Sequence, residues 1–138
     1  MSEKIIVSSC LAGFCCRYDG DHKERLDIVK MVQEGLAIPV CPEQLGGLPT
    51  PREPAEVQGD KVITKSGADV SAEYERGANE ALKMAQIIGA KKAILKSKSP
   101  MCGCDLIYDG SYSGQIKSGD GVFTKLLKLN SIEVESID

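Results

Sequence analysis

The stretch Ile5-Ile6-Val7-Ser8-Ser9-Cys10 decides the fold, because a short β-branched run, typical of a buried strand, ends just before a thiol. The same pattern returns as Ile38-Pro39-Val40 before Cys41 and as Ala93-Ile94-Leu95 upstream of Cys102. Open α/β folds place their sites at the carboxyl ends of parallel strands. Three thiols delivered to such ends from distant parts of the chain therefore predict one shared metal centre.

Helical patterns separate these strands. A first helix is expected after Asp21, which has capping-box spacing to Glu24. Its apolar face would be formed by Leu26, Val29 and Val32. Further helices are expected over residues 71–88 and 120–129, and a last strand over residues 132–134. The alternation predicts an α/β fold, a single three-layer α/β/α domain over residues 1–138 with a mostly parallel, Rossmann-like sheet.

Two segments between these elements are candidates for the rim of the site. The loop from Pro42 to Pro54 is rich in Pro and Gly and too long for a plain connector, and such loops are often functional. Residues 56–65 alternate around Gly59-Asp60, which predicts a small surface hairpin. We expect the loop and the hairpin, from Gln58 to Lys65, to form the rim of a pocket over the cysteines.

A short motif occurs twice. Tyr18-Asp19-Gly20 recurs as Tyr108-Asp109-Gly110, each time a short distance after a cysteine-containing loop. Asp-Gly is a common turn pair, which is one sufficient explanation. The alternative is that the two copies form matching walls around one pocket.

Composition narrows the functional classes. With 138 residues, 42% of them hydrophobic, the chain is long enough for one domain with a real core. It shows no secretory signal and no apolar run near the roughly 18 residues that span a bilayer, so we expect a cytoplasmic location and no membrane partner. A net charge of -3 argues against a large nucleic-acid partner. A local patch can still hold one phosphate, and its candidate residues are Arg17, Arg52, Lys96 and Lys98.

The spacing of the cysteines matches neither a zinc ribbon nor a ferredoxin-type run. Three converging thiolates with no evident fourth ligand leave an open coordination position, as in reactive rather than structural metal sites. A metal exposed there can act as a Lewis acid. Alternatively, the cysteines are small residues that fill buried space.

Several separated motifs run along essentially the whole chain. They are Ser9-Cys10-Leu11-Ala12-Gly13, Arg17-Tyr18-Asp19-Gly20, Cys41-Pro42-Glu43, Leu45-Gly46-Gly47-Leu48-Pro49-Thr50-Pro51-Arg52, Lys96 to Gly103, Ile107-Tyr108-Asp109-Gly110 and Ser113-Gly114. In order and spacing they resemble the thiouracil desulfurase family, formerly a family of unknown function. Its members use an iron-sulfur cluster to remove sulfur from thiolated pyrimidines.

The resemblance implies roles for individual residues. Cys10, Cys41 and Cys102 look like the three ligands of a [4Fe-4S] cluster whose fourth iron is left for substrate. Glu43 and Ser99 look like the catalytic polar residues of the family. Two simpler roles remain open, since Glu43 can cap the following turn and Ser99 can satisfy a loop carbonyl.

Some residues depart from the family pattern or stay unassigned. Met101 stands where the family usually has Ser, which makes the pocket more apolar. Three further thiols lie near the proposed ligands and can either bind metal or receive sulfur; they are Cys15, Cys16 and Cys104. His22 is expected to be solvated. Arg52 is expected to meet an anionic part of the substrate or to pair with Glu53 or Glu56.

The expected function is hydrolytic, non-redox C-S cleavage of a small 2-thiouracil-like heterocycle, with the sulfur captured by the open iron. Glu43 would transfer the protons and Ser99 would position the reacting groups. The alternative is a non-catalytic protein that carries an iron-sulfur cluster or a persulfide, which needs no carboxylate beside the cluster. A closed structural zinc domain is a third possibility.

Overall fold

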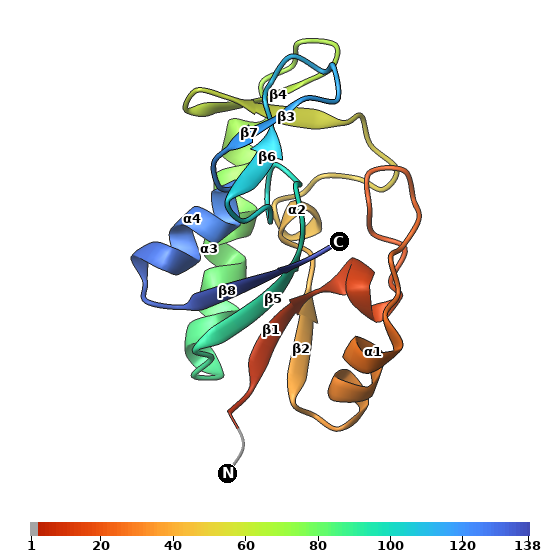
Figure 1. Ribbon diagram of the computed structural model, residues 1–138, viewed down its shortest axis with the longest axis vertical. Helices are drawn as coiled ribbons and strands as arrows, with labels where there is room; N and C mark the ends of the chain where they lie inside the picture. The colour runs from red at the N-terminus through yellow and green to blue at the C-terminus, as the bar shows by residue number, and fades with distance from the viewer. Residues whose placement is uncertain (1–2) are drawn as a thin grey trace.

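The computed structural model describes residues 3–138 and is built around one parallel sheet (Figure 1). Its four strands lie in the order β2-β1-β5-β8 and pair in parallel throughout. They are β1 (Ile5–Ser8), β2 (Ala37–Val40), β5 (Lys92–Lys96) and β8 (Glu133–Ile137). The predicted α/β fold is confirmed. The carboxyl ends of β2, β1 and β5, which precede the three cysteines, lie side by side.

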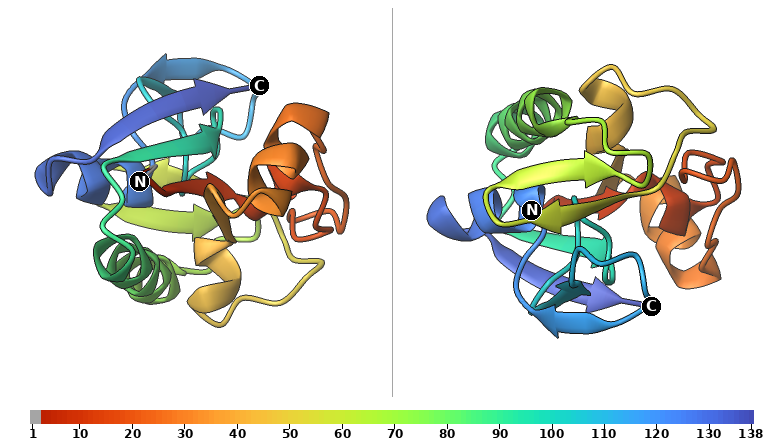
Figure 2. Two further views of the ribbon diagram at one scale, coloured as in Figure 1. Left: turned by 90° about the horizontal axis from the view of Figure 1, so that it is seen from below. Right: turned by 90° about the horizontal axis from the view of Figure 1, so that it is seen from above.

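Helices cover both faces of the sheet (Figure 2). The 3₁₀ turn η1 (Ser9–Ala12) and α1 (Leu26–Gln33) lie on one face, and α3 (Ser71–Ile87) and α4 (Val122–Leu129) lie on the other. Successive residues of β1 alternate between the two cores, with Ile6 packed toward α3 and α4 and Val7 toward α1. No helix within residues 3–138 has the length and apolar character needed to cross a bilayer.

The start of α1 differs from the prediction. The predicted capping box would pair the Asp21 side chain with the backbone N–H of Glu24. The Asp21 carboxylate instead accepts the backbone N–H of His22 at 2.7 Å. Backbone bonds from Lys23 N–H to the carbonyl oxygen of Cys10 and from Arg25 N–H to that of Leu11 hold the preceding segment along η1. The helix therefore begins only at Leu26, whose side chain is exposed, and the residue that it buries is Ile28.

Two small antiparallel ribbons lie beyond the carboxyl ends of the sheet strands (Figure 1). The first, β3 (Ala55–Gln58) and β4 (Lys61–Thr64), confirms the predicted hairpin around Gly59-Asp60. The second, β6 (Leu106–Tyr108) and β7 (Ile116–Ser118), was not expected from the sequence. The ribbons are joined where the Glu56 carboxylate accepts the Gly110 N–H at 2.9 Å and the Gln58 amide donates to the Gly110 carbonyl at 2.8 Å. Together they form a cover above the sheet.

Candidate active site

Cys10, Cys41 and Cys102 line one cavity of about 820 Å³ at the carboxyl edge of the sheet. Cys10 lies in η1 directly after β1, and Cys41 directly follows β2. Cys102 lies in the loop after β5. Because β2, β1 and β5 are neighbours, each thiol enters the cavity from an adjacent strand end.

The position of Cys41 depends on a close contact between α2 (Pro42–Leu45) and α3. A Cβ at Gly77 of α3 would lie 1.7 Å from the Pro42 carbonyl oxygen, and one at Gly46 would lie 2.0 Å from the Glu73 carbonyl oxygen. Only glycine allows the two backbones to approach this closely. This contact fixes the turn that carries both Cys41 and Glu43.

A second turn fixes Cys102. The Ser99 hydroxyl oxygen accepts the N–H of Cys102 at 2.7 Å, and the Ser99 carbonyl accepts the N–H of Gly103 at 2.9 Å. Ser99 therefore caps one helical turn beside the cavity, whose wall it also lines. Its hydroxyl hydrogen remains available for a group inside the cavity.

The thiols are chemically suited to a soft metal. All six cysteines, which all lie in the described part of the chain, are free. Burial raises the pKa of Cys10 to about 11 and raises the pKa of Cys102 well above its ordinary value. A hydrogen bond from the Cys16 thiol lowers the pKa of Cys41 to about 7. A buried thiolate with no positive charge beside it is energetically unfavourable. Iron that replaces the thiol protons supplies that charge, so these three thiols fit an iron-sulfur cluster.

The structure separates the three additional thiols. Cys15 is exposed, and Cys104 is half-buried outside the set of residues that line the cavity. Cys16 is buried and lines the cavity next to Cys41, whose Sγ lies 3.8 Å from the Cys16 carbonyl oxygen. Cys16 is therefore the extra thiol nearest to the proposed ligands.

Cys104 belongs to a separate polar cluster. Its sulfur and one oxygen each from Asp105 and Asp120 lie within 4.8 Å of one another. The ammonium of Lys128 lies 3.1 Å from both carboxylates. A side-chain cation thus already balances this cluster.

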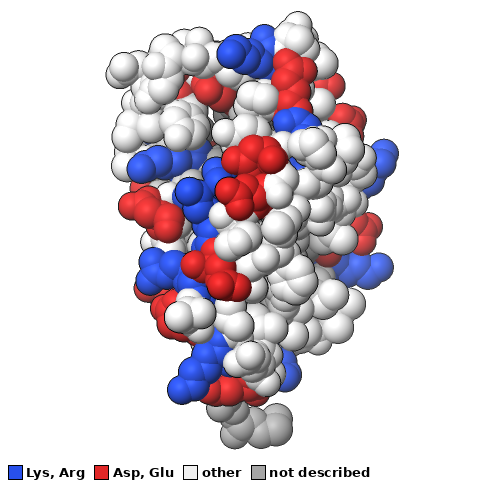
Figure 3. Space-filling model, turned by 90° about the vertical axis from the view of Figure 1, so that its right-hand side faces the viewer, with Lys and Arg blue, Asp and Glu red and all other residues white. Residues whose placement is uncertain are grey.

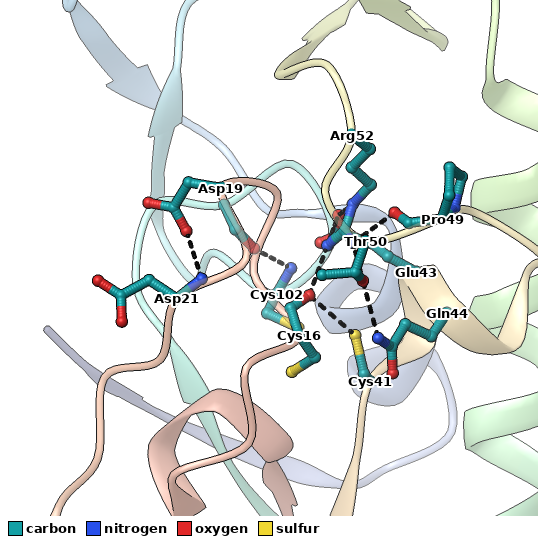
Figure 4. A network of polar contacts seen from close by, with 11 residues as sticks. Cys16, Asp19, Asp21, Cys41, Glu43, Gln44, Pro49, Thr50, Arg52 and Cys102 are labelled. Carbon is teal, nitrogen blue, oxygen red and sulfur yellow. Dashed lines mark hydrogen bonds and ion pairs between the residues drawn. The ribbon is translucent and has the colours of Figure 1, made fainter.

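Glu43 is held by an ion pair with Arg52, for which the sequence had left open an anionic group of the substrate or pairing with Glu53 or Glu56. Arg52 places Nε at 2.8 Å and Nη2 at 2.7 Å from Oε2 of Glu43, and only 7% and 16% of the two side chains are exposed (Figure 4). The expected pairing of Arg52 with Glu53 or Glu56 is wrong, because Glu53 binds Ser66 and Glu56 binds the Gly110 backbone.

Arg52 also connects the ion pair to the cysteine loops. It donates to the Cys16 carbonyl at 2.9 Å and to the Pro49 carbonyl at 3.1 Å. Tyr74 of α3 lies beside Glu43, and burial raises the pKa of Tyr74 well above its ordinary value, so its hydroxyl stays a donor. The carboxylate of Glu43 is thus fixed from two sides.

Sequence reasoning missed two residues of the site. Tyr74 lies in the helix expected over residues 71–88, and its helical spacing gives no sign of Glu43. Ser8 is buried at the end of β1, where its hydroxyl oxygen accepts the Lys96 N–H at 3.0 Å and its hydroxyl hydrogen bonds the Cys102 thiol. The sequence signal for the contact between Ser8 and Cys102 is a serine at the end of a strand, directly before the first cysteine loop.

The predicted rim is partly wrong. The long loop contributes Pro42, Arg52 and Pro54 to the cavity wall, and β3 contributes Ala55 and Glu56. Among residues 3–138, the cavity wall includes none from 58–65. Glu56 and Gln58 instead tie the hairpin to the loop after β6, where both bind the backbone of Gly110.

The predicted basic patch lies on the cavity wall. Its members are Arg17, Arg52, Lys96 and Lys98. His22 is exposed, as expected, and its Nδ1 accepts the N–H of Glu24 at 3.0 Å. On the side of the molecule that carries α1, basic and acidic side chains are intermixed (Figure 3). Charge recognition at the cavity therefore depends on these few residues and not on a broad field.

Comparison with known proteins shows the family of this chain. Residues 5–138 match the family described as 2-thiouracil desulfurase. The chain belongs to this family.

Two relatives illustrate the similarity. The solved structure of the [4Fe-4S]-dependent thiouracil desulfidase TudS is 47% identical to this chain, with a TM-score of 0.94, and the match covers 98% of this chain and 91% of that one. The uncharacterized protein YbbK of Bacillus subtilis (strain 168) is 46% identical over 90% of this chain and 89% of its own length. This family member is thus a homologue of a [4Fe-4S]-dependent desulfidase over nearly its full length.

Proposed function

We propose that this family member is a [4Fe-4S]-dependent enzyme that removes sulfur from a thiouracil-like base, with residues 1–138 acting as one cytoplasmic unit. Cys10, Cys41 and Cys102 would hold the cluster. The observation that carries the proposal is the delivery of three free thiols from adjacent strand ends to one cavity. The 47% identity to a [4Fe-4S]-dependent desulfidase supports it.

Cys10, Cys41 and Cys102 would hold a cluster that supplies Lewis-acid chemistry; it would make a thiocarbonyl carbon more electrophilic, so that water adds there and the sulfur leaves as sulfide. Glu43 acts on the protons of the reaction. Arg52 holds the carboxylate of Glu43 in place, and Glu43 accepts a proton from the attacking water. Tyr74 limits rotation of the carboxylate, so that Glu43 can return the proton to a ring nitrogen of the product.

Ser99 positions the reacting groups. Its oxygen is fixed by the N–H of Cys102, while its hydroxyl hydrogen can be donated to the ring carbonyl or to the attacking water. The residue thereby ties the orientation of the substrate to the turn that carries a proposed ligand. A serine that only capped the loop would accept the N–H of Cys102 but would not donate to the substrate or to water.

The basic side chains that line the cavity affect which charged form of the substrate should bind. Arg17 and Lys96 line the cavity, and burial lowers the pKa of Lys96. Positive groups next to a binding site favour an anionic substituent. A free thiolated base, its nucleoside and its nucleotide should therefore be compared directly.

One observation favours the alternative of a sulfur carrier. The buried thiol of Cys16 lies beside Cys41 in the cavity, where it could attack the outer sulfur of a donor persulfide and take over that sulfur while the donor leaves as a thiol. The two functions differ in one measurement. Protein reconstituted anaerobically with iron and sulfide should release sulfide from 2-thiouracil over many turnovers, whereas a carrier, which takes sulfur only from a donor persulfide, should release no more than about one equivalent. Failure to exceed one equivalent with every thiolated base would reject the enzyme proposal.

A further inference from the structure

The two Tyr-Asp-Gly segments are the same structural motif. Asp19 Oδ1 accepts the N–H of Asp21 at 3.0 Å, a contact drawn in Figure 4, and Asp109 Oδ1 accepts the N–H of Ser111 at 2.9 Å. The glycine inside each turn has a left-handed backbone, with φ of 79° at Gly20 and 94° at Gly110. Both segments are thus Asx turns, in which an aspartate carboxylate closes the turn over a glycine.

Each turn follows a tyrosine that lines the cavity. Tyr18 belongs to the segment between η1 and α1, and Tyr108 belongs to β6, so the two rings come from separate parts of the fold. Tyr18 is 43% exposed and Tyr108 is 38% exposed. Large aromatic side chains that remain this exposed on a cavity wall provide surface for a ligand.

The backbones that carry the two rings are fixed. The carbonyl oxygen of Tyr18 accepts the N–H of Arg52 at 2.7 Å. Tyr108 pairs with Ile116 in the second ribbon, and the following Gly110 is bound by Glu56. Rigid backbones with exposed rings are the arrangement that binds a flat molecule at little entropic cost.

The other two tyrosines differ from this pair. Tyr74 is buried beside Glu43, and the hydroxyl of Tyr112 donates to the carbonyl oxygen of Ile63. One face of Tyr18 is already approached by a cation, since the guanidinium carbon of Arg17 lies 5.7 Å from the ring centroid. Tyr18 and Tyr108 are therefore the pair of tyrosines that the repeat leaves exposed on the cavity wall.

We propose that Tyr18 and Tyr108 are specificity-determining residues that stack against the planar ring of the substrate. This inference rests on the proposed function, because it assigns the wall that recognises the heterocycle. Aromatic stacking favours flat, delocalised rings over puckered ones. The enzyme should accordingly prefer an aromatic thiolated base to its saturated analogue.

The test compares 2-thiouracil with dihydro-2-thiouracil, whose saturated ring is not flat. Tyr108→Ala and Tyr18→Ala should each weaken 2-thiouracil binding and raise its KM about 3- to 10-fold, with kcat within about twofold. Binding of the saturated analogue should change less than about twofold. Tyr→Phe variants should behave as the wild type, and Tyr→Leu variants, which keep bulk without an aromatic face, should behave as the Ala variants.

Leu106→Ala is the matched control. Leu106 lies two residues before Tyr108 on the same strand and is 43% exposed. In the described part of the chain, residues 3–138, it is not among the residues that line the cavity. Equal losses for both compounds in the Ala variants, unchanged binding, or loss in the Phe variants would each overturn the stacking role.

Equilibrium dialysis of cluster-loaded protein separates the two proposals. If the wild type binds 2-thiouracil with the expected tyrosine dependence but releases no sulfide from any thiolated base, the proposed function fails and the stacking role stands. If the wild type turns over and the tyrosine variants show no selective loss, the stacking role fails and the function stands. Absence of any binding by the wild type rejects both.

Discussion

The carboxyl edge of the sheet and the cover above it contribute differently to one cavity. The sheet edge supplies buried groups, with Cys10 and Cys102 only 7% and 6% exposed. The cover supplies Tyr108, which is 38% exposed and is held by a ribbon of short strands. A rigid edge suits groups that must be placed accurately for chemistry, and a loop-rich cover suits recognition. Changes at the edge should therefore affect turnover, while changes in the cover should affect substrate affinity.

The largest expected effect lies at the edge. Cys41→Ser should abolish cluster binding and sulfide release, because a serine hydroxyl is a poor ligand for iron in place of a thiolate. The same outcome is expected for Cys10→Ser and Cys102→Ser. Iron and acid-labile sulfide per protein, measured after anaerobic reconstitution, provide the readout.

Cys15→Ser is the matched control, since Cys15 is exposed and adjacent to the buried Cys16. It should load a full cluster. Cys16→Ser should also load it, because the three proposed ligands are intact in this variant. Normal iron content in Cys41→Ser together with loss in Cys16→Ser would transfer the ligand role to Cys16.

Glu43→Gln should retain the cluster and lower kcat by about 10²- to 10⁴-fold, the usual contribution of a positioned acid-base group. The amide keeps the size of the carboxylate but cannot accept a proton. Cluster absorbance and the rate of sulfide release from 2-thiouracil should be measured on the same preparation. A fully loaded variant with unchanged kcat would remove Glu43 from the proton transfers.

The ion pair beneath the site should contribute more to stability than pairs on the surface. Arg52→Met leaves the largely buried Glu43 carboxylate without its partner, which should cost about 3 kcal/mol of unfolding free energy. Arg25→Met breaks an exposed pair with Asp27, at 3.5 Å, and should change stability by less than about 0.5 kcal/mol. Urea unfolding of the two variants tests this difference, and equal effects would contradict it.

Features that depend on local sequence were predictable. A β-branched run followed by cysteine is contained in a few residues, so the strands and the expected convergence of Cys10, Cys41 and Cys102 could be derived before the structure. The hairpin was predictable for the same reason, since its turn pair, Gly59-Asp60, lies directly between the two strands that it joins.

Features that depend on distant contacts were not predictable. Glu43, Arg52 and Tyr74 meet only because the chain folds α2 onto α3, which no local spacing encodes. The start of α1 was wrong because backbone bonds from Lys23 and Arg25 to η1 override the capping-box pattern. The second ribbon was missed because its strands have three residues each and are mostly exposed, so they carry no alternation of apolar residues.

The smallest expected effect lies in the cover and tests the comparison most directly. The carboxylate of Glu56 accepts the N–H groups of Gly110 at 2.9 Å and Tyr112 at 3.2 Å, and so holds the turn that follows Tyr108. Glu56→Ala should loosen this turn and raise KM for 2-thiouracil about 2- to 5-fold, because the loss of two hydrogen bonds to a partly exposed group is modest. The value of kcat should stay within about twofold, since the sheet edge is untouched.

Glu34→Ala serves as the control, because it removes an equal charge from the exposed end of α1, where Glu34 pairs with Lys30 at 3.9 Å. It should leave both kinetic constants unchanged. If Glu56→Ala instead lowers kcat with KM unchanged, the cover takes part in the chemistry, and the division between an edge for turnover and a cover for recognition does not hold. If KM rises in Glu56→Ala while kcat is unchanged, and neither changes in Glu34→Ala, the effect lies at the part of the cavity wall that carries Tyr108.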